Sequence, residues 1–146
     1  MPFGIKKSIH FFFDGIKPML RNRKELRRFI IFIFASEGVK LDSLNFIFST
    51  DQAVYKINRR FLNHEFFTDI VTFNLAGKGN PVCADVYISI DRVRDNALRQ
   101  GETFQKELHR VIFHGALHLC GYNDKSPSQT REMRRKEDQY LSRYFG

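Results

Sequence analysis

Two different periodicities of apolar residues follow one another along the chain, and this mixture most limits the fold. Leu44, Phe46 and Phe48 stand at every second position, as in a half-buried strand. By contrast, apolar residues between Leu26 and Phe34 recur every three or four positions, which predicts an amphipathic helix. Because no repeat or polar linker divides the sequence, we expect one α+β domain over residues 1–146.

The same patterns predict the order of the elements. We expect strands at 9–13, 44–49, 71–75 and 86–90, and helices at 26–38, 50–61, 91–99, 104–119 and 128–144. Pro18 marks a further position where a helix could begin, and Asp91 is the expected N-cap of the third helix. The sequence therefore predicts a small mixed four-stranded sheet covered by helices.

The chain is strongly basic. It has 24 Lys plus Arg against 16 Asp plus Glu, which gives a formal charge of +8 and a pI of about 9.7. In a domain of this size, such an excess favours a polyanionic partner such as nucleic acid. Charge alone leaves open a basic protein whose cations only keep it in solution.

The apolar segments suit a packed core rather than a membrane. The longest unbroken apolar run, Phe29–Ala35, is far shorter than the ~20 residues that a spanning helix needs. Asp14 interrupts the apolar stretch near the N-terminus and no small-residue cleavage site follows, so we expect no signal peptide. Cys83 and Cys120 form no CxxC pair, which favours reduced thiols in the cytoplasm.

The segment 114–124 carries the chemistry. His114 and His118 are four residues apart on a predicted helix, so their imidazoles project about 40° apart from one face. Gly121 allows the helix to end and the chain to reverse, which returns Asp124 toward the pair. Two imidazoles and one carboxylate leave a fourth position open, as in a catalytic zinc site. We therefore predict a metal site at the end of this central helix.

Two other interpretations of this segment remain. Paired helix histidines are often surface residues, and Asp124 could cap the next helix or lie in a turn. The spacing HxxxHxxGxxD also matches the metzincin proteases, with Asp as the third ligand. Their general base is a Glu directly after the first histidine. Gly115 occupies that position, which argues against a protease.

The segment 114–124 resembles the signature HGxLHLxGYDH of the YbeY family. Thr68–Phe73 is similar to the family motif T(D/N)VLSF, and Ala84–Ser89 resembles its GDIxIS strand. Glu107 and the leucine after it resemble the Glu-Leu pair of the family. The similarity extends from about residue 45 to 144, whereas the N-terminal third agrees only in pattern.

This resemblance implies a single-domain bacterial endoribonuclease that binds one zinc ion. The implied reaction is cleavage of single-stranded RNA in ribosomal RNA processing, including maturation of the 3′ end of 16S rRNA. It further implies a part in ribosome quality control. RNA and the small ribosomal subunit or its proteins are the implied partners, and the cytoplasm is the implied location.

The chain departs from the family pattern at two positions. The usual third ligand is His, where this sequence has Asp124, and the register favours Asp124 over Asn123. Leu62 stands where the family typically has an Arg that faces the substrate. We therefore expect Arg59 and Arg60, which precede the strand 68–73, to contact phosphate instead.

Three further residues have two interpretations each. Glu107 lies on the same helical stripe as His114, so it could exchange a proton or hold a neighbouring group in place. Asp85 could orient a ligand or make a buried hydrogen bond. Cys120 lies beside the predicted ligands, although a small core residue is its more frequent role.

Three classes of function stay open. A zinc-dependent endoribonuclease stands first. A non-catalytic RNA- or ribosome-binding factor with a vestigial metal site is the alternative that Leu62 favours. A metallopeptidase is the third, and Gly115 argues against it.

Overall fold

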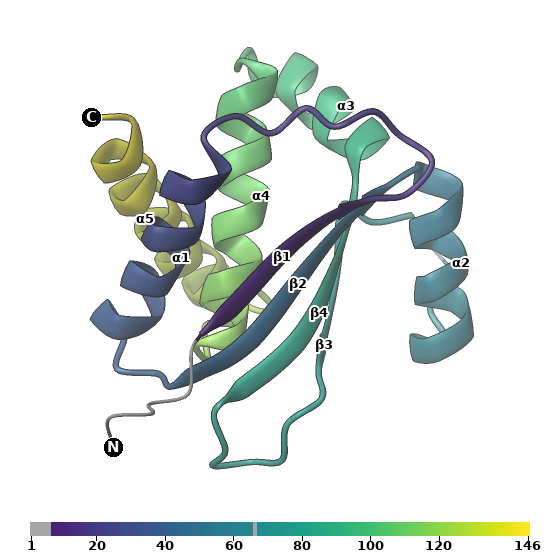
Figure 1. Cartoon of the computed structure of the whole chain (residues 1–146). Coiled ribbons are helices and arrows are strands. Elements are labelled where there is room, and N and C mark those ends of the chain that lie inside the picture. Colours follow the sequence, from purple (N-terminus) through teal and green to yellow (C-terminus); the bar gives the residue numbers. More distant parts are fainter. Residues whose placement is uncertain (1–6, 66) are drawn as a thin grey trace.

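The computed structural model describes residues 7–65 and 67–146, which form a four-stranded sheet and five helices (Figure 1). The strands are β1 (Ser8–Phe13), β2 (Leu41–Ser49), β3 (Ile70–Asn74) and β4 (Val82–Ser89). The helices are α1 (Arg23–Ser36), α2 (Asp51–Leu62), α3 (Ile90–Gln100), α4 (Phe104–Leu119) and α5 (Pro127–Phe145). This confirms the predicted α+β class and the order of the elements.

The sheet is mixed, with the strand order β1-β2-β4-β3. β1 pairs in parallel with β2, and β2 with β4, whereas β3 runs antiparallel to β4 at the edge. The parallel neighbours need long crossover connections, which α1 provides between β1 and β2. β3 and β4 instead form a hairpin whose turn contains Gly77 and Gly79. The edge position of β3 leaves one side of this strand open.

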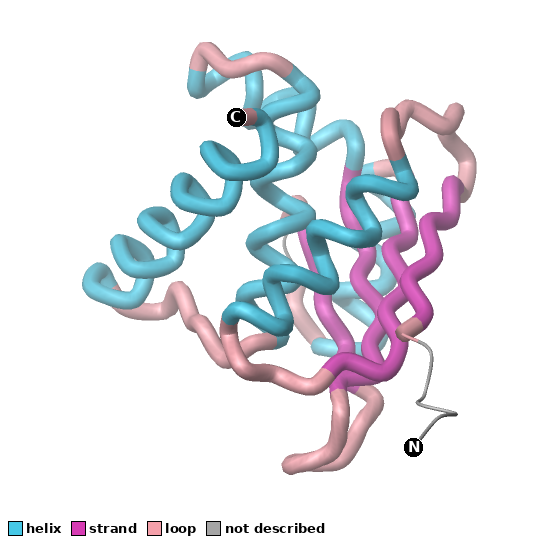
Figure 2. Tube along the Cα trace, turned by 60° about the vertical axis from the view of Figure 1, so that its left-hand side comes forward, coloured by secondary structure: helices cyan, strands magenta, loops and turns pink. Residues whose placement is uncertain are grey.

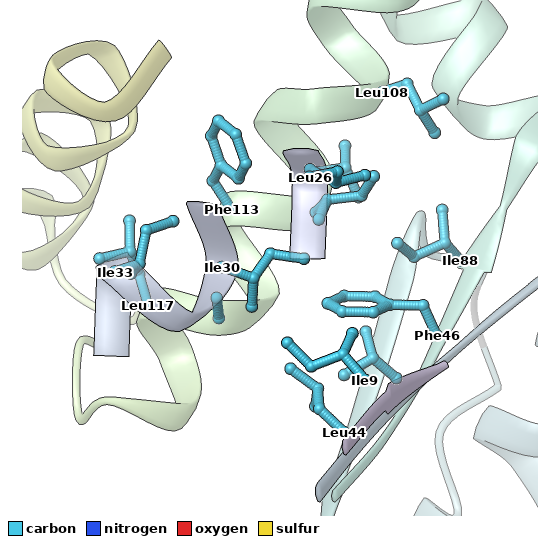
Figure 3. Close-up of a cluster of buried hydrophobic side chains, with 14 of the residues drawn as sticks. Ile9, Leu26, Ile30, Ile33, Leu44, Phe46, Ile88, Leu108, Phe113 and Leu117 are labelled. Atoms are coloured by element: carbon cyan, nitrogen blue, oxygen red, sulfur yellow. The ribbon is translucent and has the colours of Figure 1, made fainter. Parts of the chain in front are cut away.

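The core lies between one face of the sheet and the helices α1, α4 and α5 (Figures 2 and 3). Phe46 and Ile88 point from β2 and β4 into this layer, where they meet Leu26 and Ile30 of α1. The neighbouring strand residues point to the other face. α2 packs there against β3 and β4. Because side chains alternate along a strand, one face of the sheet contributes to the main core and the other face packs against α2.

Side-chain caps fix where several helices begin. Thr50 and Ser89 accept hydrogen bonds from the first turns of α2 and α3. The prediction that Asp91 caps α3 is wrong. Its carboxylate instead accepts a hydrogen bond from the backbone N–H of Asp51 at 2.8 Å. No helix begins at Pro18 either, because the chain is irregular until α1.

α4 is the central helix and is buried on most of its surface. Gly115 lies where α4 meets the sheet, since a Cβ there would stand 2.8 Å from Cδ1 of Ile70 and 3.3 Å from Cγ1 of Val86. The glycine therefore lets the helix approach β3 and β4 closely. Despite this burial, no helix in the described part of the chain combines the length and apolar character that a membrane span requires.

Candidate active site

A cavity of about 580 Å³ lies beside β3, α4 and the start of α5. His114, His118 and Asp124 all line it, so the fold brings the three predicted ligands to one cavity. Larger hollows of about 840 and 910 Å³ lie along α5, but neither has a histidine among its described lining residues. The cavity beside β3 is therefore the candidate active site.

His114 is held from both sides of its ring. Its Nδ1 donates to Oε2 of Glu137 at 2.8 Å, and its Nε2 lies 3.5 Å from Oδ2 of Asp124. Burial lowers the pKa of His114, but the hydrogen bond to Glu137 and the charges of Glu137, Asp69 and Asp124 outweigh it and raise the pKa. The ring is thus fixed with Nε2 toward a carboxylate.

His118 lies one helical turn further along α4 and is exposed. Its Nδ1 lies 3.1 Å from the backbone carbonyl of Tyr122, just beyond the end of the helix. Donation from Nδ1 to this carbonyl leaves Nε2 as the nitrogen with a free lone pair. In both histidines, then, Nδ1 has a protein acceptor and Nε2 remains for a ligand.

Asp124 follows the reversal of the chain at Gly121, whose φ of 108° suits glycine. The hydroxyl of Thr130 donates to the backbone carbonyl of Asp124 at 3.1 Å and ties this segment to α5. Asn123 is exposed and is not among the described residues that line the cavity. The geometry therefore agrees with the sequence register that favours Asp124.

The donor types and their neighbours fit a zinc ion. In a tetrahedral zinc site two ligand atoms lie roughly 3.3–3.5 Å apart, and the distance between His114 Nε2 and Asp124 Oδ2 is 3.5 Å. Metal-binding histidines usually donate their other N–H to a carboxylate or carbonyl, as His114 and His118 do. Across residues 7–65 and 67–146, however, no three His, Cys, Asp or Glu side chains stand close enough to share an ion. The ligand set stays a prediction.

A buried cluster of charges supports His114 from behind. Arg110, which is 5% exposed, donates to Asp138 at 2.8 Å and to Glu137 at 3.4 Å. Glu107 is 2% exposed, and its Oε1 has no hydrogen-bond partner among the described residues, although Arg110 Nε lies 3.6 Å away. Burial raises the pKa of Glu107, against the lowering effect of Arg110. The buried position of Glu107 beside Arg110 favours a role in holding that neighbouring group in place over a role in proton exchange.

Asp69 also lines the cavity and is absent from the predicted site residues. Its carboxylate accepts a hydrogen bond from the amide of Asn96 at 3.2 Å. Burial raises the pKa of Asp69, while His114 lowers it. An acidic residue directly before an apolar strand was the available sequence signal, but only the fold shows that it faces α4.

Arg59 and Arg60 are exposed on α2, whose buried face carries Val54 and Asn58. Neither arginine is among the described residues that line the cavity, whereas Leu62 is. The structure thus places an apolar side chain at the cavity wall and the two cations outside it. Their contact with phosphate stays a prediction.

Asp85 and Cys120 do not line this cavity in the described part of the chain. Asp85 accepts a hydrogen bond from the amide of Asn45 at 3.1 Å, which matches its structural interpretation. Burial raises the pKa of the Cys120 thiol to about 12, so this residue remains protonated and packs against the core. Neither Cys83 nor Cys120 forms a disulfide.

Comparisons with known proteins show the family to which the chain is similar. The family model described as Endoribonuclease YbeY matches residues 17–145. The Endoribonuclease YbeY of Cytophaga hutchinsonii is 42% identical over 137 residues, which cover 94% of this chain and 96% of the relative. That of Bacteroides thetaiotaomicron is 38% identical and covers 88% and 93%. The solution structure of TM1509 from Thermotoga maritima is 25% identical with a TM-score of 0.61, covering 97% and 90%.

Proposed function

Because the chain belongs to the Endoribonuclease YbeY family, we propose that it cleaves phosphodiester bonds within single-stranded RNA. Its substrate is ribosomal RNA, including the 3′ end of 16S rRNA, and its wider role is in ribosome quality control. The observation that carries this proposal is the cavity that His114, His118 and Asp124 all line. The charge of +8 supports a polyanionic substrate.

We assign one zinc ion to His114, His118 and Asp124. When bound, zinc supplies a Lewis acid for a phosphoryl oxygen and makes hydroxide available near pH 7. The protein orients these ligands. Glu137 fixes the ring of His114 through Nδ1, and the carbonyl of Tyr122 does the same for His118.

Asp69 is the carboxyl group that we assign to proton exchange. It lines the same cavity as His114, and burial raises its pKa, which favours a carboxyl group that exchanges a proton. Glu107 balances the charge of Arg110 instead, since its Oε1 is buried beside that guanidinium. Arg59 and Arg60 hold phosphates outside the cavity.

The small ribosomal subunit or its proteins are the partners that we propose, and the cytoplasm is the location. A ribosomal subunit carries RNA and is therefore a polyanion, so a basic surface beside the cavity would contact both substrate and subunit. The exposed Lys56, Arg59 and Arg60 on α2 provide such a surface.

Leu62 supports the second candidate, a non-catalytic RNA-binding factor, because it places an apolar group at the cavity wall. A metallopeptidase finds no such support. A side chain at position 115 would point toward β3 and β4. Its Cβ alone would lie 2.8 Å from Cδ1 of Ile70. A glutamate base therefore does not fit at that position without displacing Ile70.

Cleavage of an internally labelled single-stranded RNA tests the proposal, together with elemental analysis of the protein. We expect about one zinc per chain and cleavage products in the wild type, and loss of both in His114→Ala and His118→Ala. His10→Ala is the matched control, since His10 is exposed on β1. RNA binding without cleavage by the zinc-loaded wild type would contradict the enzyme and favour the binding factor.

A further inference from the structure

β3 forms an open edge of the sheet. In the part of the chain that is described, this strand pairs with β4 alone. The carbonyl of Asp69 accepts from β4 at 2.9 Å, and the N–H of Leu75 donates to β4 at 2.7 Å. Since antiparallel ladders alternate, the backbone groups of the residues between, Ile70, Thr72 and Asn74, are directed to the open edge.

Most of this edge borders the candidate active site. Residues 68–72 line the cavity together with His114, whereas Asn74 is not among the described lining residues. The hydroxyl of Thr68 already donates to the carbonyl of Ile70 at 3.3 Å. Two donors and one acceptor therefore face the cavity side: the N–H groups of Ile70 and Thr72 and the carbonyl of Thr72.

The contact between α4 and β3 keeps this edge next to the predicted ligands. A Cβ on Gly115 would lie 2.8 Å from Ile70 and 3.9 Å from Cγ2 of Thr72. His114 directly precedes this glycine. A polymer chain lying along the edge would therefore pass His114.

We propose that the open edge of β3 binds the ribose-phosphate backbone of the RNA substrate. The N–H groups of Ile70 and Thr72 donate to phosphate oxygens, and the carbonyl of Thr72 accepts from a ribose 2′-hydroxyl. RNA offers both phosphate oxygens for the N–H groups and a 2′-hydroxyl for the carbonyl. DNA lacks the 2′-hydroxyl and so cannot donate to the carbonyl. The inference rests on the proposed function and adds how RNA is distinguished from DNA.

An extended peptide is the other polymer that pairs with sheet edges. Charge favours RNA at this edge. The adjacent helix α2 exposes Lys56, Arg59 and Arg60, and its acidic Asp51 is already bound by Arg92 at 3.1 Å. The cavity lining itself is mixed, with Asp69 and Asp124 beside Arg134. A polyanion that runs along the edge past the cavity gains from the three cations of α2, whereas a neutral or basic peptide does not.

Proline at an outward-facing edge position removes one N–H without breaking the ladder to β4. We would measure binding of RNA and DNA strands of equal sequence to Thr72→Pro, with cleavage followed separately. Thr72→Ala keeps the N–H and controls for the side chain. Asn74→Pro controls for the proline, because Asn74 faces the same edge outside the cavity-lining stretch.

We expect Thr72→Pro to weaken RNA binding roughly 10- to 100-fold, the range for a lost hydrogen bond to a charged group. Asn74→Pro should bind like the wild type, and Thr72→Ala should lose less affinity than Thr72→Pro because it keeps the N–H. A single 2′-deoxy substitution in the RNA should weaken binding at one position in the wild type and in Thr72→Pro alike, because proline keeps the carbonyl that accepts from the 2′-hydroxyl. This scan needs only the wild-type chain if the proline variant does not fold.

Equal RNA binding by Thr72→Pro and Asn74→Pro would overturn the proposal, as would a deoxy scan without a sensitive position. Loss of binding to an extended ribosomal-protein peptide with unchanged RNA binding would assign the edge to a protein strand and overturn it too. Absence of cleavage by the wild type refutes the nuclease function instead, because these binding measurements do not depend on turnover.

Discussion

Nδ1 of His114 lies 2.8 Å from Oε2 of Glu137, across the contact between α4 and α5. Glu137 is 5% exposed and is itself held by Arg110. This hydrogen bond fixes the ring so that Nε2 faces Asp124. The last helix therefore determines the orientation of a predicted metal ligand that belongs to another helix.

Glu137→Gln should weaken zinc binding about 10- to 100-fold, the usual effect of losing a charged partner of a ligating histidine. Glutamine keeps the shape and one acceptor, so the fold should persist. Competition with a chelator measures the affinity. Glu132→Gln is the control, because Glu132 lies on the same helix and pairs with the exposed Arg135. Equal affinities in both variants would refute a positioning role for Glu137.

The elements could be predicted from the sequence because their apolar periods are clear. α4 from Phe104 and β2 through Phe48 are examples. The failure at Asp91 has a physical reason. Its carboxylate reaches the backbone of Asp51, a long-range contact that local capping patterns do not contain.

Gly115→Ala should destabilise the protein by about 1 kcal/mol. The new Cβ would overpack against Ile70 and Val86, which costs roughly 1–3 kcal/mol, and the better helix propensity of Ala offsets up to about 1 kcal/mol. Urea unfolding measures the difference. Ile70→Val removes the closest atom, so the double variant should regain part of the loss. A simple sum of the two single effects would contradict the contact.

Glu37 should contribute stability that depends on pH. Burial raises the pKa of Glu37, but hydrogen bonds from Tyr140, Tyr122 and Lys136 outweigh it and lower the pKa. A carboxylate with a lowered folded pKa stabilises the protein above its unfolded value of about 4.5, and this contribution disappears as the pH falls through the folded pKa. Unfolding free energies should therefore fall less from pH 7 to pH 3 in Glu37→Gln.

Glu25→Gln is the matched control for that measurement, because Glu25 is exposed on α1, the helix whose C-cap is Glu37. Its pH dependence should equal that of the wild type. Tyr122→Phe tests the link to the site, since the hydroxyl of Tyr122 donates to Glu37 at 2.7 Å and its carbonyl orients His118. An unchanged zinc affinity in this variant would show that the hydrogen bond from Tyr122 to Glu37 does not affect the orientation of His118.

The candidate site could be predicted only in its local part. His114, His118 and Asp124 lie within eleven residues, so helix geometry and one chain reversal bring them to the same cavity. Asp69 and Glu137 join them through the packing of β3 and α5 on α4. Contacts between such distant segments have no fixed residue spacing, so no sequence motif reveals them.

Arg59→Ala with Arg60→Ala should reduce the salt dependence of RNA binding. Each lost contact with a single strand lowers the slope of log affinity against log salt by about 0.7, so the pair should lower it by roughly 1.4 if both contact phosphate. Lys24→Ala with Arg28→Ala removes two exposed cations from α1 as the control. An unchanged slope would exclude Arg59 and Arg60 as phosphate contacts.

Asp124→Ala should lower the zinc content strongly, because it removes the carboxylate that lies 3.5 Å from His114. Asn123→Ala should have little effect, since Asn123 is exposed outside the described cavity lining. Asp124→His should keep the metal, because zinc accepts imidazole or carboxylate. The loss of one negative charge makes the site more positive, so the pH profile of RNA cleavage should move to lower pH. Elemental analysis of all three variants decides the register: zinc lost from Asn123→Ala but kept in Asp124→Ala would rule out the three-ligand site.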